Sequence, residues 1–363
     1  MKQRTMQVLA SAGLCAALCF IPGCKVGYLI SSGYYQAELL HSREPVQELR
    51  EQELLNATEL QRLDLIADVK AFGAEIGLSA TDNYETLAWG WERTIWNVTG
   101  CDPVAFTPKT WWFPIVGQFP YLGYFREEDA RKLEGQLLDD GLDVYVRTAG
   151  AYSTLGWFKD PILPGMLTWD DYQLADTVLH ELAHATLWVP GSVEFNESYA
   201  NFVGEVAAMR YLQDRRGHHD PALLDAIQRN QDSSAFQDVL HETYAELDAL
   251  YTNPDLTDQE KLAQKADVLT TGMQQKVRSA PLNNPEAYLA YIEEVPWNNA
   301  RLIQFKTYNT DEQVFASLLA DQGGDLLAFI RLVEQVTDGP DDPALALRQA
   351  AGMLREEDLL LFE

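Results

Sequence analysis

The chain is short of positive charge: 27 Lys and Arg stand against 55 Asp and Glu, a net charge of −28 at neutral pH. Such a chain is repelled by the phosphates of nucleic acid, so we expect no nucleic-acid partner. It also lacks a phosphate-cradling glycine loop, a Cys-x-x-Cys pair and an internal repeat. What remains is the composition of a folded globular protein, with 47% apolar and 23% charged residues.

Cysteine is scarce as well, with four in 363 residues, and three of them fall within the first 24. Lys2 and Arg4 give this segment a basic start, and residues 8–21 form an uncharged apolar run. The run is shorter than the roughly 20 residues that span a bilayer. It predicts a targeting signal that is removed from the mature protein.

The residues that close this segment, Ile21-Pro22-Gly23-Cys24, resemble a bacterial lipobox. The resemblance implies that residues 1–23 are a lipoprotein signal peptide and that Cys24 is the lipidation site. An ordinary secretory signal or an uncleaved anchor is the alternative. We expect a protein of the bacterial cell envelope, held at the outer membrane by its lipid and facing the periplasm.

The hydrophobic periodicity predicts a mainly α fold with a small β element (α+β), forming a single domain over residues 24–363. Short strands are expected at 89–98 and 142–146. The aromatic, Pro- and Gly-rich residues 108–125 are expected to form a loop that packs on the core. Helical spacing is present at 43–78, 127–140, 171–188, 194–215, 221–277 and 298–335.

The chemistry is concentrated in His180-Glu181-Leu182-Ala183-His184, which lies within an apolar helical pattern. On a helix, His180 and His184 are stacked one turn apart and can bind one metal ion through their imidazole nitrogens. Glu181 lies beside them, where it can take the proton from a metal-activated water. A pair of histidines with a purely structural role is the alternative. The spacing predicts a catalytic Zn²⁺ site.

A catalytic zinc ion is usually held by three protein ligands. The turn around Pro190 and Gly191 allows the next helix to run back antiparallel and bring Glu197 to the metal. Glu194 and Glu205 are rival third ligands. Glu205 lies two turns further along the helix, and Glu194 lies at its start, where the helix dipole favours an acid in any case.

The pattern His180-Glu181-x-x-His184 followed by Asn196-Glu197 resembles the gluzincin metallopeptidases. A bacterial family of predicted aminopeptidases, usually lipoproteins, is similar over nearly the whole chain. The matching blocks are Gly23-Cys24, Gly27-Tyr28-Leu29, residues 112–117, 151–158 and 160–161, the zinc motif, Phe195-Asn196-Glu197-Ser198 and Asn298-Asn299-Ala300.

This resemblance implies a gluzincin-like body in which Glu197 is the third ligand. It also implies an edge strand near residues 151–158 that could pair with a peptide substrate, although a structural hairpin is equally compatible with that segment. A hydroxyl donor for the tetrahedral intermediate is expected as well. Tyr308 is the candidate for this catalytic role, and Tyr199 is its rival.

The sequence therefore predicts a zinc-dependent peptidase, specifically an aminopeptidase, that acts on peptides and is attached to the membrane through Cys24. One alternative is a zinc-binding envelope lipoprotein that serves as a scaffold or chaperone without turnover. The presence of Glu181 argues against it, because a structural zinc site does not need that residue. A metal-dependent hydrolase of non-peptide amides is the third possibility.

Overall fold

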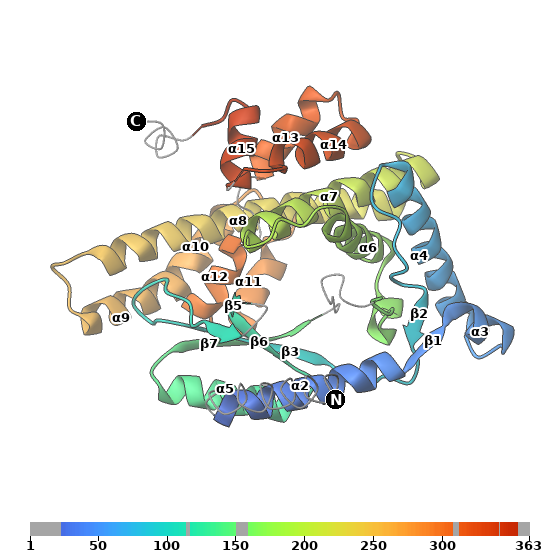
Figure 1. The fold of residues 1–363 in the computed structure, drawn as a ribbon. Coiled ribbons are helices and arrows are strands. Elements are labelled where there is room, and N and C mark those ends of the chain that lie inside the picture. Colours follow the sequence, from blue (N-terminus) through green and yellow to red (C-terminus); the bar gives the residue numbers. More distant parts are fainter. Residues whose placement is uncertain (1–22, 114–116, 150–158, 308–311, 341, 355–363) are drawn as a thin grey trace, which may run out of the picture.

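The computed structural model describes residues 23–113, 117–149, 159–307, 312–340 and 342–354, and it confirms a mainly α fold with small sheets (Figure 1). The first helices are α2 (Gly23–His41), α3 (Val46–Glu51), α4 (Ala57–Glu75), α5 (Glu127–Asp139), α6 (Asp171–Thr186) and α7 (Val193–Arg216). The later ones are α8 (Pro221–Thr252), α9 (Asp258–Asp267), α10 (Met273–Ser279), α11 (Pro285–Glu294), α12 (Asn299–Thr307), α13 (Glu312–Asp321), α14 (Leu326–Thr337) and α15 (Pro343–Ala350).

Among the described residues, the β structure consists of three small antiparallel units. A three-stranded sheet has the order β6-β3-β7, with Val98 of the central strand opposite Leu122 on one side and Val146 on the other. The other two units are the pairs β1–β2 and β4–β5. The strands are β1 (Arg43–Pro45), β2 (Thr86–Ala88), β3 (Ile95–Cys101), β4 (Trp111–Phe113), β5 (Gly117–Phe119), β6 (Tyr121–Tyr124) and β7 (Asp143–Ala149).

Two expectations about the strands were wrong in part. The strand expected at 89–98 begins only at Ile95, because the residues before it form a turn around Gly90, whose φ is +73°. Residues 108–125 are not simply a loop, since β4, β5 and β6 lie within them. Proline and glycine there separate short strands, and the aromatic residues between them have high strand propensity.

The helices predicted at 127–140, 171–188 and 194–215 are confirmed as α5, α6 and α7, and residues 43–78 contain α3 and α4 after the short strand β1. The three-stranded sheet lies between two helical layers (Figure 1). On one face, Ala130 and Leu137 of α5 pack against Val98 of β3. On the other face, Gln304 of α12 donates from Nε2 to Thr99 Oγ1 at 2.6 Å.

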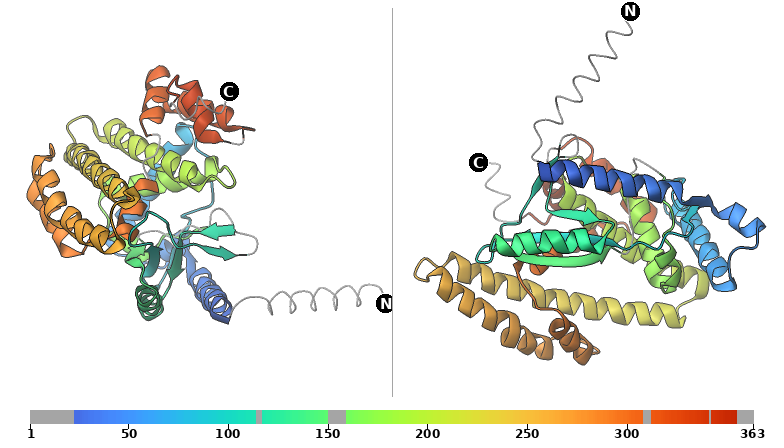
Figure 2. Two further views of the ribbon diagram at one scale, coloured as in Figure 1. Left: turned by 90° about the vertical axis from the view of Figure 1, so that its left-hand side faces the viewer. Right: turned by 90° about the horizontal axis from the view of Figure 1, so that it is seen from below.

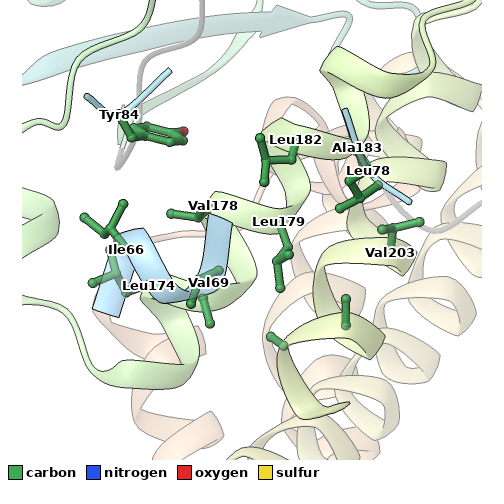
Figure 3. Close-up of a cluster of buried hydrophobic side chains, with 14 of the residues drawn as sticks. Ile66, Val69, Leu78, Tyr84, Leu174, Val178, Leu179, Leu182, Ala183 and Val203 are labelled. Atoms are coloured by element: carbon green, nitrogen blue, oxygen red, sulfur yellow. The ribbon is translucent and has the colours of Figure 1, made fainter. Parts of the chain in front are cut away.

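The main core surrounds α6, which is covered by α4 on one side and α7 on another (Figure 3). Half of the 16 residues of α6 are buried, so the helix is held firmly in place. Those that Figure 3 labels on α6 are Leu174, Val178, Leu179, Leu182 and Ala183. A second core lies among α8, α10, α11 and α12, which form an arm to one side (Figures 1 and 2).

Among the described residues, no helix is both long enough and apolar enough to cross a bilayer.

Candidate metal centre

A tight turn between α6 and α7 brings the two helices together. Asp170 caps the start of α6 by accepting a hydrogen bond from Gln173 N at 2.8 Å. Past the other end of α6, the Asn196 side chain closes the turn: its Oδ1 accepts from Val189 N at 2.8 Å, and its Nδ2 donates to Val189 O at 2.9 Å. Asn196 is fully buried, so it fixes the direction in which α7 leaves the turn.

The side-chain partners along the pair show that α6 and α7 run antiparallel, as predicted. His184 near the end of α6 lies opposite Glu197 in the second turn of α7, while Asp171 at the start of α6 forms an ion pair with Arg216 at the end of α7. The two ends of the pair are therefore tied together. The histidines of α6 and the carboxylate of α7 are held at the end nearer the turn.

The helices approach closely because α7 has a glycine where they meet. A Cβ on Gly204 would lie 2.8 Å from Asp176 Oδ1, 2.9 Å from Asp176 O and 3.1 Å from His180 Cβ. Two of these neighbours belong to a backbone or to a Cβ, which cannot move without moving the helix. A larger residue would push α7 away from the helix that carries both histidines.

The structure brings His180, His184 and Glu197 together into a potential metal-binding cluster. Nε2 of His180 lies 3.9 Å from Glu197 Oε2, and Nε2 of His184 lies 3.7 Å from Glu197 Oε1. One ligand atom from each residue falls within 4.8 Å of the others. The two imidazole rings are nearly perpendicular, at 87°. Two imidazoles and one carboxylate match the donor set of a catalytic zinc site.

The charge state of the cluster suits a divalent cation. Burial, together with the neighbouring His184, lowers the pKa of His180 to about 4, although Glu197 and a hydrogen bond with Asn201 act to raise it. Burial alone would raise the pKa of Glu197, but His184, His180 and Arg147 outweigh it and hold that pKa below its usual value. At neutral pH His180 is thus a neutral imidazole and Glu197 a carboxylate, which are the forms that bind metal.

One nitrogen of the cluster has no hydrogen-bond partner within the described residues. Nδ1 of His184 is buried in this state, whereas buried imidazole nitrogens are normally paired. Nδ1 is not the nitrogen that faces the cluster, since Nε2 of the same ring lies 3.7 Å from Glu197 Oε1. The donor set and the charge states of His180 and Glu197 fit a zinc ion.

Tyr84 lies close enough to Glu181 to feel its charge, and sequence reasoning did not mark it. It has a φ of +63°, uncommon for a residue with a side chain, and is 5% exposed. Its ring points toward the side of α6 that carries Val178 and Leu182 (Figure 3). Burial and the charges of Glu181 and Asp160 raise the pKa of Tyr84 well above its usual value. At neutral pH the phenol therefore keeps its proton, and no local motif marks this residue in the sequence.

The other residues considered from the sequence are the rival ligands, the two tyrosines and the segment 151–158. Glu194 is exposed, and neither it nor Glu205 belongs to the metal-binding cluster. Tyr199 is fully buried, and its ring packs against Phe195 and Phe315 at centroid distances of 6.2 and 6.1 Å, so it is a core residue. Tyr308 and residues 151–158 lie outside the described residues, and the roles expected for them stay predictions.

Glu205 instead belongs to a second buried group behind the metal cluster. Its Oε1 accepts a hydrogen bond from Asn230 Nδ2 at 2.9 Å, and the same amide donates to Tyr172 Oη at 2.7 Å. Burial and the charge of Glu205 raise the pKa of Asp176 to about 7. Burial and the charge of Glu312 raise the pKa of Glu205 to about 7. Both carboxyls therefore retain protons that they would lose in an unfolded chain at the same pH.

This arrangement predicts a pH-dependent cost in stability. Between about pH 4 and pH 7 the folded chain binds more protons than the unfolded one, so stability falls as pH rises through this window. One pKa unit is worth about 1.4 kcal/mol, which bounds the cost at roughly 4 kcal/mol for Asp176. In Asp176→Asn we expect the loss of unfolding free energy between pH 5 and pH 8 to shrink by about 1–3 kcal/mol.

Urea unfolding at both pH values, with chelator present, measures this difference. Glu92→Gln, which changes an exposed acid, should leave the pH dependence as it is in the unsubstituted protein. An unchanged pH dependence in Asp176→Asn would show that Asp176 is already ionised at neutral pH.

A protein-family model matches most of the chain. The model of the family described as "Putative aminopeptidase" matches residues 27–346. The chain belongs to this family. The match includes the helix pair α6–α7 and the metal-binding cluster, as well as the three-stranded sheet and the whole helical arm. Searches of curated proteins and of solved structures find no match.

Proposed function

We propose that this aminopeptidase-family protein is a zinc-dependent peptidase. The observation that carries the proposal is the convergence of His180, His184 and Glu197 on one point, with Glu181 adjacent to His180 on the same helix. A purely structural zinc site would have no use for that extra carboxylate. The family description supports peptide hydrolysis independently of the metal.

In this proposal His180, His184 and Glu197 hold the zinc ion, and the chain supplies the proton chemistry. When bound, zinc would provide Lewis acidity that activates water and polarises the scissile carbonyl. Glu181 would accept the proton of the attacking water and deliver it to the leaving amine. The neutral phenol of Tyr84 could donate a hydrogen bond near Glu181, and Arg147 adds positive charge near Glu197.

We favour an aminopeptidase over an endopeptidase because of the family description. The rival function, a zinc-bearing scaffold or chaperone, would retain the metal cluster but show no turnover. A hydrolase of non-peptide amides would use the same residues. Of these three functions, only the aminopeptidase would release the N-terminal residue of a peptide. A peptide with a free amino terminus is therefore the substrate to test.

Metal removal tests the proposal. The protein, purified with its metal content measured, should release N-terminal residues from a mixed peptide library, as read by mass spectrometry of the products. Treatment with a chelator should abolish this release, and equimolar Zn²⁺ should restore it, because the metal supplies the activation of water. Release that is insensitive to chelation would contradict zinc dependence. Internal cleavage would make the protein an endopeptidase.

We also propose that the chain is a lipoprotein of the bacterial envelope, anchored through Cys24 and facing the periplasm at the outer membrane. The lipobox-like Ile21-Pro22-Gly23-Cys24 supports this, and Trp112 and Tyr121, which are 61% and 40% exposed, are of the types enriched where proteins meet membranes. The mass of the N-terminal peptide from membrane-extracted protein tests it. An unmodified Cys24 would refute the anchor.

A further inference from the structure

A groove with an apolar lining runs beside the first described helix, far along the chain from the metal ligands. It lies between α2 and α5, which are seen side by side from below, with the strands between them (Figure 2). Its volume is about 350 Å³, within the range of small-molecule pockets. The apolar and aromatic side chains that line it are Tyr28, Trp111, Phe113, Leu122, Tyr124 and Leu133.

The part of α2 that lines the groove lies close to Cys24 in the sequence. Gly27, Tyr28 and Ser31 line it, and they follow Cys24 by three, four and seven residues. Gly27 leaves space there, since a Cβ at that position would meet nothing within 4 Å. The groove therefore has an opening less than one helical turn from Cys24.

The chemistry of the lining favours a hydrocarbon chain. Tyr28 packs against Phe113 and Tyr124 at centroid distances of 5.8 and 5.2 Å, and its hydroxyl already donates to Gly123 O at 3.1 Å. The lining residues of α5 include one charge of each sign, Asp129 and Lys132. They provide no cluster of positive charge that would hold an anionic head group. A chain placed by a covalent tether needs no such cluster.

We propose that the groove between α2 and α5 holds one acyl chain of the lipid attached to Cys24. The proposal rests on the lipidation proposed above. Part of the anchor then packs against the protein, which fixes how α2 and the β4–β5 pair are oriented at the membrane surface. A loose phospholipid is the competing occupant, and it differs from this one in having no covalent link to the chain.

Photocrosslinking tests the proposal on the full-length precursor made in bacterial cells. Cells are fed a fatty acid with a photoreactive diazirine, the membrane-extracted protein is irradiated, and crosslinked peptides are identified by mass spectrometry. We expect the lipid on Cys24 to join the N-terminal peptide to peptides containing residues 111–113, 122–124 or 133. Groove peptides that carry only the mass of a free phospholipid would overturn the proposal and assign the groove to membrane lipid.

Two glycines of α2 provide matched variants. Gly27→Phe should fill the opening and abolish the intramolecular crosslinks while lipidation continues. Gly33→Phe, also free of neighbours within 4 Å but outside the groove lining, should leave them unchanged. A labelled Cys24 that crosslinks only to lipid would overturn the groove assignment and leave the anchor standing. An unlabelled Cys24 would overturn both.

Discussion

Replacing Glu181 by Gln should leave zinc bound and lower peptide turnover by about 10²- to 10⁴-fold, the contribution of a general base. Glutamine keeps the size and hydrogen-bonding reach of the side chain but cannot accept a proton from water at neutral pH. The metal should stay, because Glu181 is not a member of the cluster formed by His180, His184 and Glu197. Zinc content by elemental analysis and kcat on a peptide substrate measure the two effects separately.

Glu194→Gln is the matched control, since it changes an exposed acid in the first turn of α7, close to the site along the chain. It should retain both zinc and turnover. Loss of zinc in Glu181→Gln would place that carboxylate among the ligands. Equal turnover by Glu181→Gln and the unsubstituted protein would remove the catalytic proposal and leave the zinc-binding scaffold.

The metal cluster could be predicted because its ligands lie close together in the sequence. His180 and His184 are joined by helical geometry alone, and the turn with Pro190 and Gly191 leaves few positions at which α7 could present a carboxylate. The choice of Glu197 over Glu205 depended on register, which local pattern constrains well when the connection is short. The helices α5 and α6 were predictable for a similar reason, since apolar residues recur along each at helical spacing.

The features that could not be predicted depend on contacts between segments distant in the sequence. Tyr84 lies about a hundred residues before Glu181, and only the fold brings its phenol near that carboxylate. The sequence predicts a loop at 108–125 because proline and glycine disfavour a strand. The pairing that nevertheless forms strands there is not visible in the local pattern. Strands as short as β4 and β5 are stabilised by pairing with each other and by the packing of Trp111 and Phe113.

Glu205, which lies near the buried Asp176, shows a further limit of prediction from sequence alone. Glu205 was a rival ligand because its spacing from the histidines could not exclude it. In the structure, Asn230 of α8 holds it, and α8 follows only after a separate turn. A carboxylate held by an amide and raised in pKa by burial is a poor ligand, because it keeps its proton at the pH where zinc would bind. The contacts of Glu205 with α8 thus explain why it is not a ligand, which its spacing alone could not show.

The different surroundings of Glu197 and Glu205 predict a large difference in zinc affinity between variants at the two positions. Glu197→Gln should weaken zinc binding by more than about 10²-fold, since even residues that only orient metal ligands contribute about 10- to 100-fold. Glu205→Gln, the same change two turns along α7, should leave zinc affinity nearly unchanged. Glutamine at 205 can still accept the hydrogen bond of Asn230, so the helix contacts are kept.

Competition with a zinc chelator of known affinity measures both variants, and circular dichroism of the metal-free forms checks that each is folded. The metal-free comparison matters because Glu197 also lies against His180 and His184 without any ion. If both variants fold and Glu205→Gln loses zinc while Glu197→Gln retains it, the third ligand is misassigned. If both lose zinc equally, the carboxylates act through the packing of α6 on α7. Loss in Glu197→Gln alone would make the carboxylate of Glu197, held in place by the Asn196 turn, the ligand that completes the site.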